Sequence, residues 1–225
     1  FRKNSPQLKA VVNEFVKGNK KGTLIGNMLL KRYLKDTKYV KNAISEQELA
    51  KFEAMVQLFK KYADNYDFDY LMIAAQAYQE SGLDQSLVSP VGAVGVMQIL
   101  PSTAASREVG IADIGELENN IHAGTKYLAF IRDRYFSDPD LEGFNPQFFS
   151  LAAYNAGPAR IRQLREEAAQ QGLDPDVWFG NVEHVAARRI GSETVRYVSN
   201  ITKYAFAYLL VVERQERVDA TLAEK

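Results

Sequence analysis

The sequence predicts a mainly α-helical protein. Along most of the 225 residues, apolar side chains recur every three or four positions, which places them on one face of an α-helix. No segment of convincing length alternates apolar and polar residues with the period of two that a half-buried strand requires. The composition, 46% hydrophobic and 25% charged, is that of a globular chain and excludes disordered and collagen-like classes.

Three helices are expected in the first part of the chain. Each begins near a Ser or Asp whose side chain can accept a hydrogen bond from a free backbone N–H group. A glycine after the first and the third helix favours termination there. The expected helices are 6–18, between Ser5-Pro6 and Gly18, then a helix to 63 that opens on the capping box of Ser45 and Glu48, and 70–81, between Asp69 and Gly82.

Further helices are expected in the second half of the chain. Two long apolar stripes indicate amphipathic helices with one buried face each, and two prolines each follow an Asn or Asp at a helix start. The expected ranges are 121–135, 145–154, a shorter helix from Pro175, and 195–212. The polar segment 213–225 is expected to fray as a tail.

Charge divides the chain into two parts. Its 28 basic and 28 acidic residues give a formal net charge of zero, so the whole chain offers no long-range attraction to nucleic acid. Residues 1–42, however, hold 11 basic and 2 acidic side chains, whereas residues 43–225 hold 17 and 26. This asymmetry predicts a basic head joined near residues 36–45 to an acidic body.

Several chemistries are excluded by what the sequence lacks. It has no cysteine, hence no disulfide, thiolate nucleophile or cysteine-bound metal. His122 and His184 have no metal-binding spacing and are expected to be structural, and no metal or cofactor is expected. The motifs of serine hydrolases, dinucleotide enzymes and P-loop nucleotidases are missing. The longest uncharged run, 85–106, is interrupted by prolines and glycines and is not a membrane span.

Glu80 is the carboxylate with the most unusual surroundings. It is the one charge in the ten residues 71–80, and a loop rich in glycine and proline follows from Gly82 to Pro101. Apolar surroundings raise the pKa of a carboxyl and keep its proton available near neutral pH, as a general acid requires. Long ordered loops are also often functional. The alternative is that Glu80 is a solvated helix end.

Five short motifs in one order resemble the lysozyme-like lytic transglycosylases, the soluble-type family that cleaves bacterial peptidoglycan. They are Gln79-Glu80-Ser81-Gly82, Ser89-Pro90-Val91-Gly92-Ala93, Gly95-Val96-Met97-Gln98-Ile99, Ala152-Ala153-Tyr154-Asn155-Ala156-Gly157, and Glu193-Thr194 with Tyr197-Val198. The resemblance implies a lysozyme-like helical domain. It also implies that Glu80 protonates the glycosidic oxygen and then deprotonates the C6 hydroxyl of N-acetylmuramic acid, which forms a 1,6-anhydro end. A second catalytic carboxylate, which ordinary glycosidases need, is then not required.

The resemblance also implies a set of substrate-binding residues. Two of them have equally simple structural explanations: Ser89 either bonds the sugar or holds a turn before Pro90, and Asn155 either binds sugar or caps a turn. Glu193 either contacts the sugar or its peptide, or complements a helix N-terminus. Met97 either faces the sugar as an apolar side chain or packs in the core, as single methionines usually do. The full set is Ser89, Met97, Gln98 as a hydrogen-bonding side chain, Tyr154 directed at Glu80 or the scissile bond, Asn155, Glu193, and Tyr197 pointing the same way as Glu193.

The domain boundaries follow from the same resemblance. Residues 1–42, including the motif at 26–34, resemble the end of a solute-binding-protein-like regulatory module and its linker, which precede the catalytic domain in a membrane-bound branch of the family. Residues 43–212 are then the catalytic domain, with 213–225 as the tail. The expected partners are peptidoglycan strands and muropeptides, in the periplasm with peripheral outer-membrane association. The alternatives are a hydrolase like goose-type lysozyme and a non-catalytic module that binds the wall or senses muropeptides.

Overall fold

The computed structural model describes residues 6–19 and 43–223. The chain separates into two compact units, Phe1–Asn42 and Ala43–Lys225. In the first unit α1 (Pro6–Asn19) is the expected first helix, and it exposes Val11 and Phe15. The motif at 26–34 lies outside the described residues.

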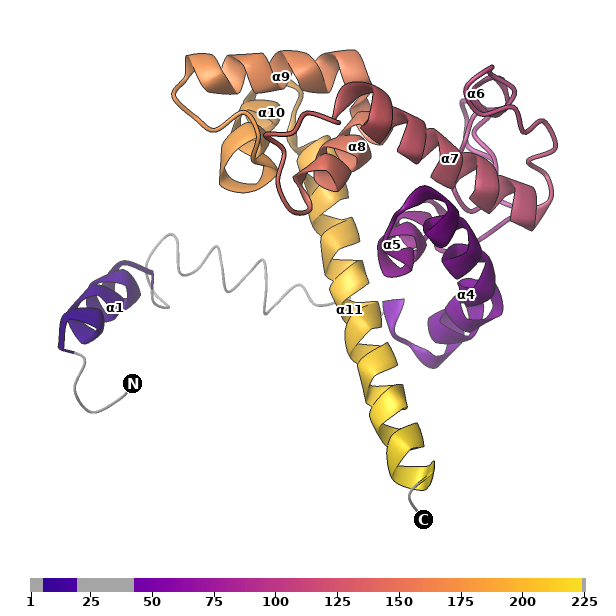
Figure 1. Ribbon diagram of the computed structural model, residues 1–225, viewed down its shortest axis with the longest axis horizontal. Coiled ribbons are helices and arrows are strands. Elements are labelled where there is room, and N and C mark those ends of the chain that lie inside the picture. Colours follow the sequence, from indigo (N-terminus) through magenta and orange to yellow (C-terminus); the bar gives the residue numbers. More distant parts are fainter. Residues whose placement is uncertain (1–5, 20–42, 224–225) are drawn as a thin grey trace. The chain divides into compact units, whose positions relative to one another are not determined.

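α5 (Tyr70–Ser81) is the central helix of the second unit. It packs against α4 (Glu46–Tyr66) on one side and α11 (Ser192–Ala223) on another, while α7 (Leu117–Tyr135) packs against α4 and α8 (Asn145–Ala156). α8 also packs against α11, which closes the arrangement (Figure 1). The helix whose last turn contains Glu80 is therefore packed between α4 and α11.

The sequence signals for α4 and α5 are confirmed at the level of single hydrogen bonds. The Ser45 side chain accepts a hydrogen bond from the Glu48 backbone N–H, and Asp69 Oδ1 accepts one from the Leu71 N–H at 2.7 Å. Gly82 ends α5 with a φ of 66°, a left-handed conformation that favours glycine. The end of the Glu80 helix is thus fixed by its own sequence.

Aromatic rings fix α11 against α4 and α5. Phe52 of α4 stacks on Tyr208 of α11 with ring centroids 4.5 Å apart. Tyr78 of α5 meets the rings of Tyr204 and Tyr208 edge-on. Edge-to-face and offset ring pairs stabilise packing beyond the area they bury. This cluster sets where the first turns of α11 lie relative to the end of α5.

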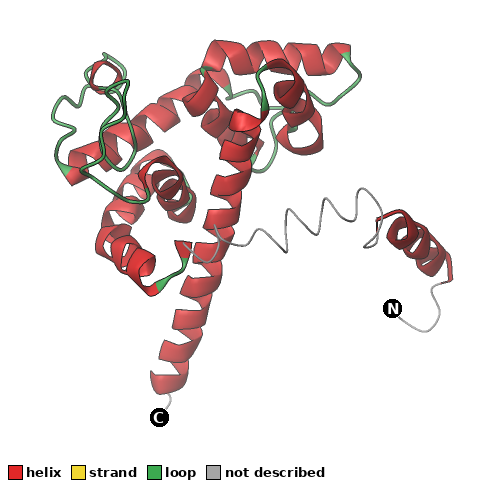
Figure 2. Ribbon diagram, turned by 180° about the vertical axis from the view of Figure 1, so that it is seen from behind, coloured by secondary structure: helices red, strands yellow, loops and turns green. Residues whose placement is uncertain are grey.

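The segment between α5 and α7 is loop except for α6 (Pro101–Ala104), as Figure 2 shows. Among residues 6–19 and 43–223, the only β pairing is isolated: Val94 bridges to Val88 and to Ile99. A small core of its own supports this loop. It consists of Ile99, Ala104, Val109, Ile114 and Ala123. The expectation of a long ordered loop after Gly82 is confirmed.

The region after Gly157 contains one helix that was not predicted and lacks one that was. Pro158–Gln170 forms α9, and only three of its residues, Ile161, Leu164 and Ala168, are buried, so its sequence carries a weak apolar stripe. The helix expected from Pro175 does not form there. Trp178–Val182 is a distorted turn in which Gly180 has a φ of 76°, and regular helix resumes at α10 (Glu183–Arg189).

The polar tail was expected to fray from residue 213, but α11 continues to Ala223. Extending an existing helix costs far less than nucleating one, and the packed first half of α11 supplies the nucleus. Gln215 donates a hydrogen bond to Asp219 one turn further on, a spacing that stabilises exposed helix. Within the ranges that the structure describes, no helix is long and apolar enough to cross a membrane.

Candidate active site

Glu80 occupies the last turn of α5 and is mostly shielded from solvent. Burial raises the pKa of its carboxyl from the ordinary 4.5 to about 7, and a hydrogen bond from Tyr197 opposes part of that rise. A buried carboxyl resists ionisation because charge is poorly solvated in an apolar environment. The surroundings expected from the uncharged run 71–79 are therefore present. At neutral pH this group can both give up and accept a proton.

Tyr197 is the direct partner of Glu80. Its hydroxyl donates to Glu80 Oε1 at 2.5 Å and accepts a hydrogen bond from Gln76 Nε2 at 3.3 Å. Burial and the nearby Glu80 charge raise the pKa of Tyr197 well above its ordinary value, so the phenol remains a donor. Gln76 is fully buried one turn before Glu80. Gln76 was not predicted from the sequence, although Gln76 and Glu80 are an i, i+4 polar pair in an otherwise apolar helix and therefore share a face.

Tyr154 lies beside this pair but does not bond to Glu80. Its hydroxyl donates to the Met97 backbone oxygen at 2.8 Å, so it does not point at Glu80, which was the first of the two expected targets. Burial raises the pKa of Tyr154 well above its ordinary value, and the Glu80 charge adds to that rise. Tyr154 therefore connects α8 to the loop that contains Met97.

Met97 does not line a cleft, contrary to expectation. Its side chain is fully buried and packs where Gly124 of α7 leaves room, because a Cβ on Gly124 would lie 2.5 Å from Met97 Cβ. What Met97 offers the site is its backbone oxygen, which Tyr154 uses. The motif suggested that the methionine side chain contacts the sugar, whereas in the structure this side chain packs in the core.

The loop side chains Ser89 and Gln98 hold the loop itself. Ser89 Oγ accepts a hydrogen bond from the Ala93 N–H at 3.0 Å, which is the turn alternative that the sequence left open. Gln98 has a φ of 44°, and its Nε2 donates to the backbone oxygens of Leu87 and Gly95. Both side chains are only half-buried, so their remaining polar atoms can still face a substrate.

Asn120 anchors the same loop and was not found from the sequence. It is fully buried on α7, where Oδ1 accepts from the Met97 N–H at 2.9 Å and Nδ2 donates to the oxygens of Val94 and Ile114. Gly95 passes so close that a Cβ there would lie 2.4 Å from Asn120 Nδ2. Asn120 lies four residues before Gly124 on the apolar face of the helix, and this position could have indicated that its side chain is buried.

Replacing Asn120 with Ala is expected to destabilise the protein by about 2–4 kcal/mol, because it leaves buried backbone groups without partners. Enzymatic activity should also fall, because the loop loses the side chain that anchors it. Urea unfolding measures the change in free energy of unfolding. Asn119→Ala, at the neighbouring half-buried position, is the matched control, and an equal effect of the two substitutions would show that Asn120 does not anchor the loop.

A hollow opens at the first turn of α11, one turn before Tyr197. It has a volume of about 400 Å³ and is lined by Asn155, Ala156, Arg160, Arg189, Ile190, Glu193 and Thr194. Asn155 Oδ1 accepts a hydrogen bond from Thr194 Oγ1 at 2.7 Å, which ties the end of α8 to α11. Asn155 and Glu193 are both exposed. The structure therefore gathers these two expected residues in one hollow, with Glu193 one turn before Tyr197 on α11.

The histidines take no part in this arrangement. His122 Nε2 lies 2.8 Å from the Tyr66 hydroxyl, and its ring stacks on Tyr62, so it joins α7 to α4. His184 is exposed on α10. Among the residues that the structure describes, no group of three His, Asp or Glu side chains could hold a metal ion.

Burial of the Glu80 carboxyl predicts that the stability of the protein depends on pH. Below pH 4.5 it is protonated in the folded and unfolded chain alike; as pH rises towards about 7 the unfolded chain ionises first, and the folded state loses up to about 3 kcal/mol. Glu80→Gln removes this loss. The free energy of unfolding of the variant should therefore rise relative to that of the native chain as pH rises from 4.5 to about 7. Urea unfolding at several pH values measures this difference. Exposed Glu53→Gln is the control, and a pH-independent difference for Glu80→Gln would contradict the burial argument.

A helical domain with a buried carboxyl at the end of its central helix is typical of the lysozyme-like enzymes, and similarity to known proteins identifies the class. Residues 57–176 match the family model described as the transglycosylase SLT domain, and the chain belongs to this family. Its relatives include membrane-bound lytic murein transglycosylase F of Desulfosudis oleivorans, 37% identical over 161 residues, which covers 65% of this chain and 34% of the relative. The protein of that name from Pseudomonas fluorescens is 32% identical over 174 residues, 71% of this chain and 34% of the relative.

Solved structures agree with this assignment. An inactive mutant of the lytic transglycosylase Slt from Pseudomonas aeruginosa superposes with a TM-score of 0.54 at 28% identity, over 70% of this chain and 24% of that one. The 70 kDa soluble lytic transglycosylase of Escherichia coli gives 0.54 at 26% identity, over 92% and 34%. The expected fold class, a lysozyme-like helical domain, is confirmed. The chain spans about a third of the length of the curated relatives it matches.

Proposed function

We propose that residues 43–212 are a catalytic domain that cleaves the β-1,4 bond between N-acetylmuramic acid and N-acetylglucosamine in peptidoglycan, leaving 1,6-anhydro-muramyl ends. The observation that carries the proposal is the Glu80–Tyr197 pair: a buried carboxyl whose pKa is about 7, hydrogen-bonded to a buried phenol. Membership of the transglycosylase SLT family supports the same reaction.

Glu80 performs both proton transfers in this reaction. Protonated Glu80 first gives its proton to the glycosidic oxygen, and the bond from that oxygen to C1 of N-acetylmuramic acid breaks. The resulting carboxylate then takes the proton of the C6 hydroxyl of the same sugar, while the C6 oxygen bonds to C1. The proton count on Glu80 is restored and no water is consumed.

The neighbours of Glu80 support each half of this cycle. Burial favours the protonated acid before the first step, and the Tyr197 hydroxyl stabilises the carboxylate between the two steps because hydrogen bonds to a charged acceptor are stronger than those to a neutral one. Gln76 holds the Tyr197 oxygen from the other side. A single carboxyl can thus alternate between acid and base without a second one at the spacing of ordinary glycosidases.

Ser89, Gln98, Asn155 and Glu193 are proposed to bind the substrate. The first two lie in the loop that Asn120 anchors, and the last two line the hollow at the first turn of α11. We place this domain in the periplasm at the outer membrane, and the names of the membrane-bound relatives support an association with a membrane.

Mass spectrometry of fragments released from purified sacculi tests the reaction. Fragments ending in 1,6-anhydro-muramic acid are expected. Reducing ends would instead identify a hydrolase like goose-type lysozyme, and binding to sacculi without release of any fragment would identify a non-catalytic wall-binding module. Either of the last two results would overturn the proposed function.

A further inference from the structure

A row of aromatic rings leads away from the candidate site along α7. It starts at Tyr154, whose ring centroid lies 5.4 Å from that of Tyr127, and continues to Phe130 at 6.5 Å and then to Tyr135 at 6.2 Å. All four rings are half-buried. Each therefore keeps some surface open to solvent.

The row runs along α7 towards its C-terminal end. Tyr127 and Phe130 are three positions apart and share a stripe of the helix, and Tyr135 is the last residue of α7. The eight steps from Tyr127 to Tyr135 rise about 12 Å along the helix axis. Half-exposed rings in series are suited to stacking against the apolar faces of sugar rings, since an aromatic ring presents a large rigid apolar surface.

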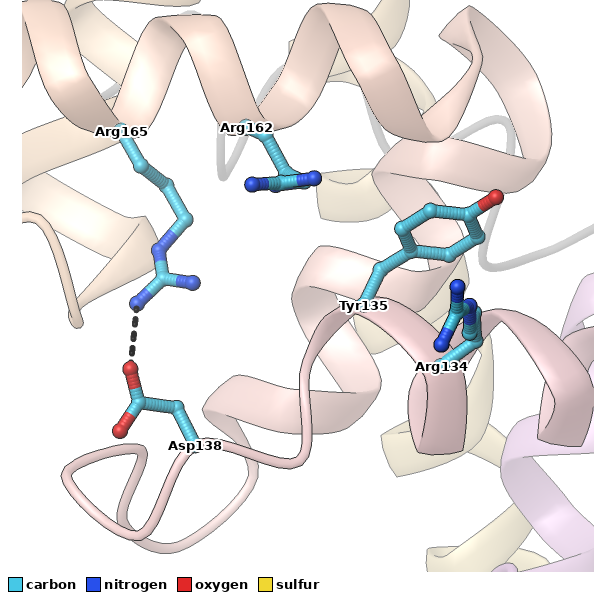
Figure 3. Close-up of a pocket in the computed structure, with 5 residues that line it drawn as sticks. All are labelled: Arg134, Tyr135, Asp138, Arg162 and Arg165. Carbon is cyan, nitrogen blue, oxygen red and sulfur yellow. Dashed lines mark ion pairs between the residues drawn. The ribbon is translucent and has the colours of Figure 1, made fainter.

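The row ends at a hollow rich in arginine. Arg134, Tyr135, Asp138, Arg162 and Arg165 line a volume of about 400 Å³. Figure 3 shows Arg134 and Tyr135 reaching this space from the end of α7, Arg162 and Arg165 from α9, and Asp138 from the loop after α7. Three positive side chains and one negative side chain therefore meet in one hollow.

Only one of the three arginines is neutralised. Arg165 pairs with Asp176, lies 3.9 Å from Asp138 and stacks over the Phe149 ring. Arg134 and Arg162 are exposed and have no ion-pair partner within the described part of the chain. Two unpaired guanidinium groups that face the same space repel each other, and an anion between them relieves that repulsion.

We propose that the hollow binds a free carboxylate of a peptide attached to the glycan strand, while the aromatic row supports the strand between the hollow and Glu80. A guanidinium presents parallel N–H donors that match the two oxygens of a carboxylate. The inference rests on the proposed function, because it adds a second attachment point for the same polymer. It assigns Arg134 and Arg162 to recognition of the peptide and not to bond cleavage.

The double variant Arg134→Gln/Arg162→Gln tests this assignment on two substrates. One is intact peptide-bearing glycan strands, and the other is the same strands after an amidase has removed their peptides. The ratio of kcat/KM for the first substrate to that for the second is expected to fall about tenfold, the effect of losing exposed charge-assisted contacts. Arg214→Gln/Arg217→Gln removes the same charge from exposed positions on α11 and is the matched control.

Each outcome either supports or overturns the assignment of Arg134 and Arg162. An unchanged ratio would overturn the inference, whether both activities persist or both fall together, and so would an equal drop in the control. If the native chain cleaves neither substrate, the proposed function has failed; binding of the Glu80→Gln protein to intact sacculi, with and without the two arginine substitutions, then replaces kinetics. Weaker binding without the arginines would support the hollow as a peptide site, and equal binding would overturn it.

Discussion

The Glu80→Gln variant is expected to lose peptidoglycan-solubilising activity by at least about a thousandfold, the scale of removing a group that acts as both acid and base. An amide of the same shape has no proton to give to the glycosidic oxygen and is too weak a base to accept one from the C6 hydroxyl. Its oxygen can still accept the Tyr197 hydrogen bond, so the site should keep its geometry. Loss of sacculus turbidity and release of soluble fragments measure the effect.

Two controls separate chemistry from folding. Glu53→Gln changes an exposed glutamate of α4 and should leave activity unaltered. The Glu80→Gln protein should keep its helical circular dichroism and its binding to sacculi. Retention of a tenth or more of the native rate would show that Glu80 does not carry the proton transfers.

Tyr197→Phe is expected to slow turnover by about ten- to a hundredfold and to move the alkaline limb of the pH–rate profile to higher pH. The phenol donates a charge-assisted bond to Glu80 that is worth about 1.5–3 kcal/mol in favour of the carboxylate. Because that bond lowers the pKa of Glu80, its loss leaves the burial effect unopposed and raises the pKa further. The acid stays protonated to higher pH, while the carboxylate needed for the second step becomes less stable.

The pH dependence distinguishes this effect from simple loss of structure. Tyr70→Phe, at a half-buried tyrosine at the other end of α5, should leave both the rate and the profile unchanged. A lower rate for Tyr197→Phe with an unshifted profile, or with a shift towards lower pH, would contradict the role of Tyr197 as the donor that tunes Glu80.

Local signals predicted the helix that carries Glu80 because each signal acts within a few residues. Asp69 caps the first turn and Gly82 terminates the last, and neither depends on the rest of the fold. The absence of charge from 71–79 likewise indicated that the carboxyl would be surrounded by apolar groups, as it is. Where a single residue determines a single backbone hydrogen bond, the local structure could be predicted from the sequence.

Contacts between distant segments could not be predicted in the same way. Met97 and Tyr154 are 57 residues apart, and their hydrogen bond uses a backbone oxygen that every residue type provides. Asn120 was overlooked because polar residues in an amphipathic pattern are assumed to face solvent, whereas here three hydrogen bonds to the loop compensate its burial. The tail from 213 was judged by its polarity alone, without the packed helix that it extends.

The arginine hollow illustrates the same limit. Arg134 belongs to α7 and Arg162 to α9, and nothing in their sequence spacing indicates that they meet. The motifs do not contain what the structure adds, a series of neighbouring aromatic rings that leads from Tyr154 to Tyr135 at the end of α7, next to Arg134.

Titration of the Glu80 carboxyl itself tests the central claim most directly. NMR of the protein carrying isotope-labelled glutamate, with Glu80→Gln to assign the resonance, gives the pKa of this one group. The burial and hydrogen bonding described above predict a midpoint at about 7, with the acid still largely protonated just below neutral pH. A midpoint near the ordinary value of 4.5 would contradict the claim that one buried carboxyl serves first as acid and then as base.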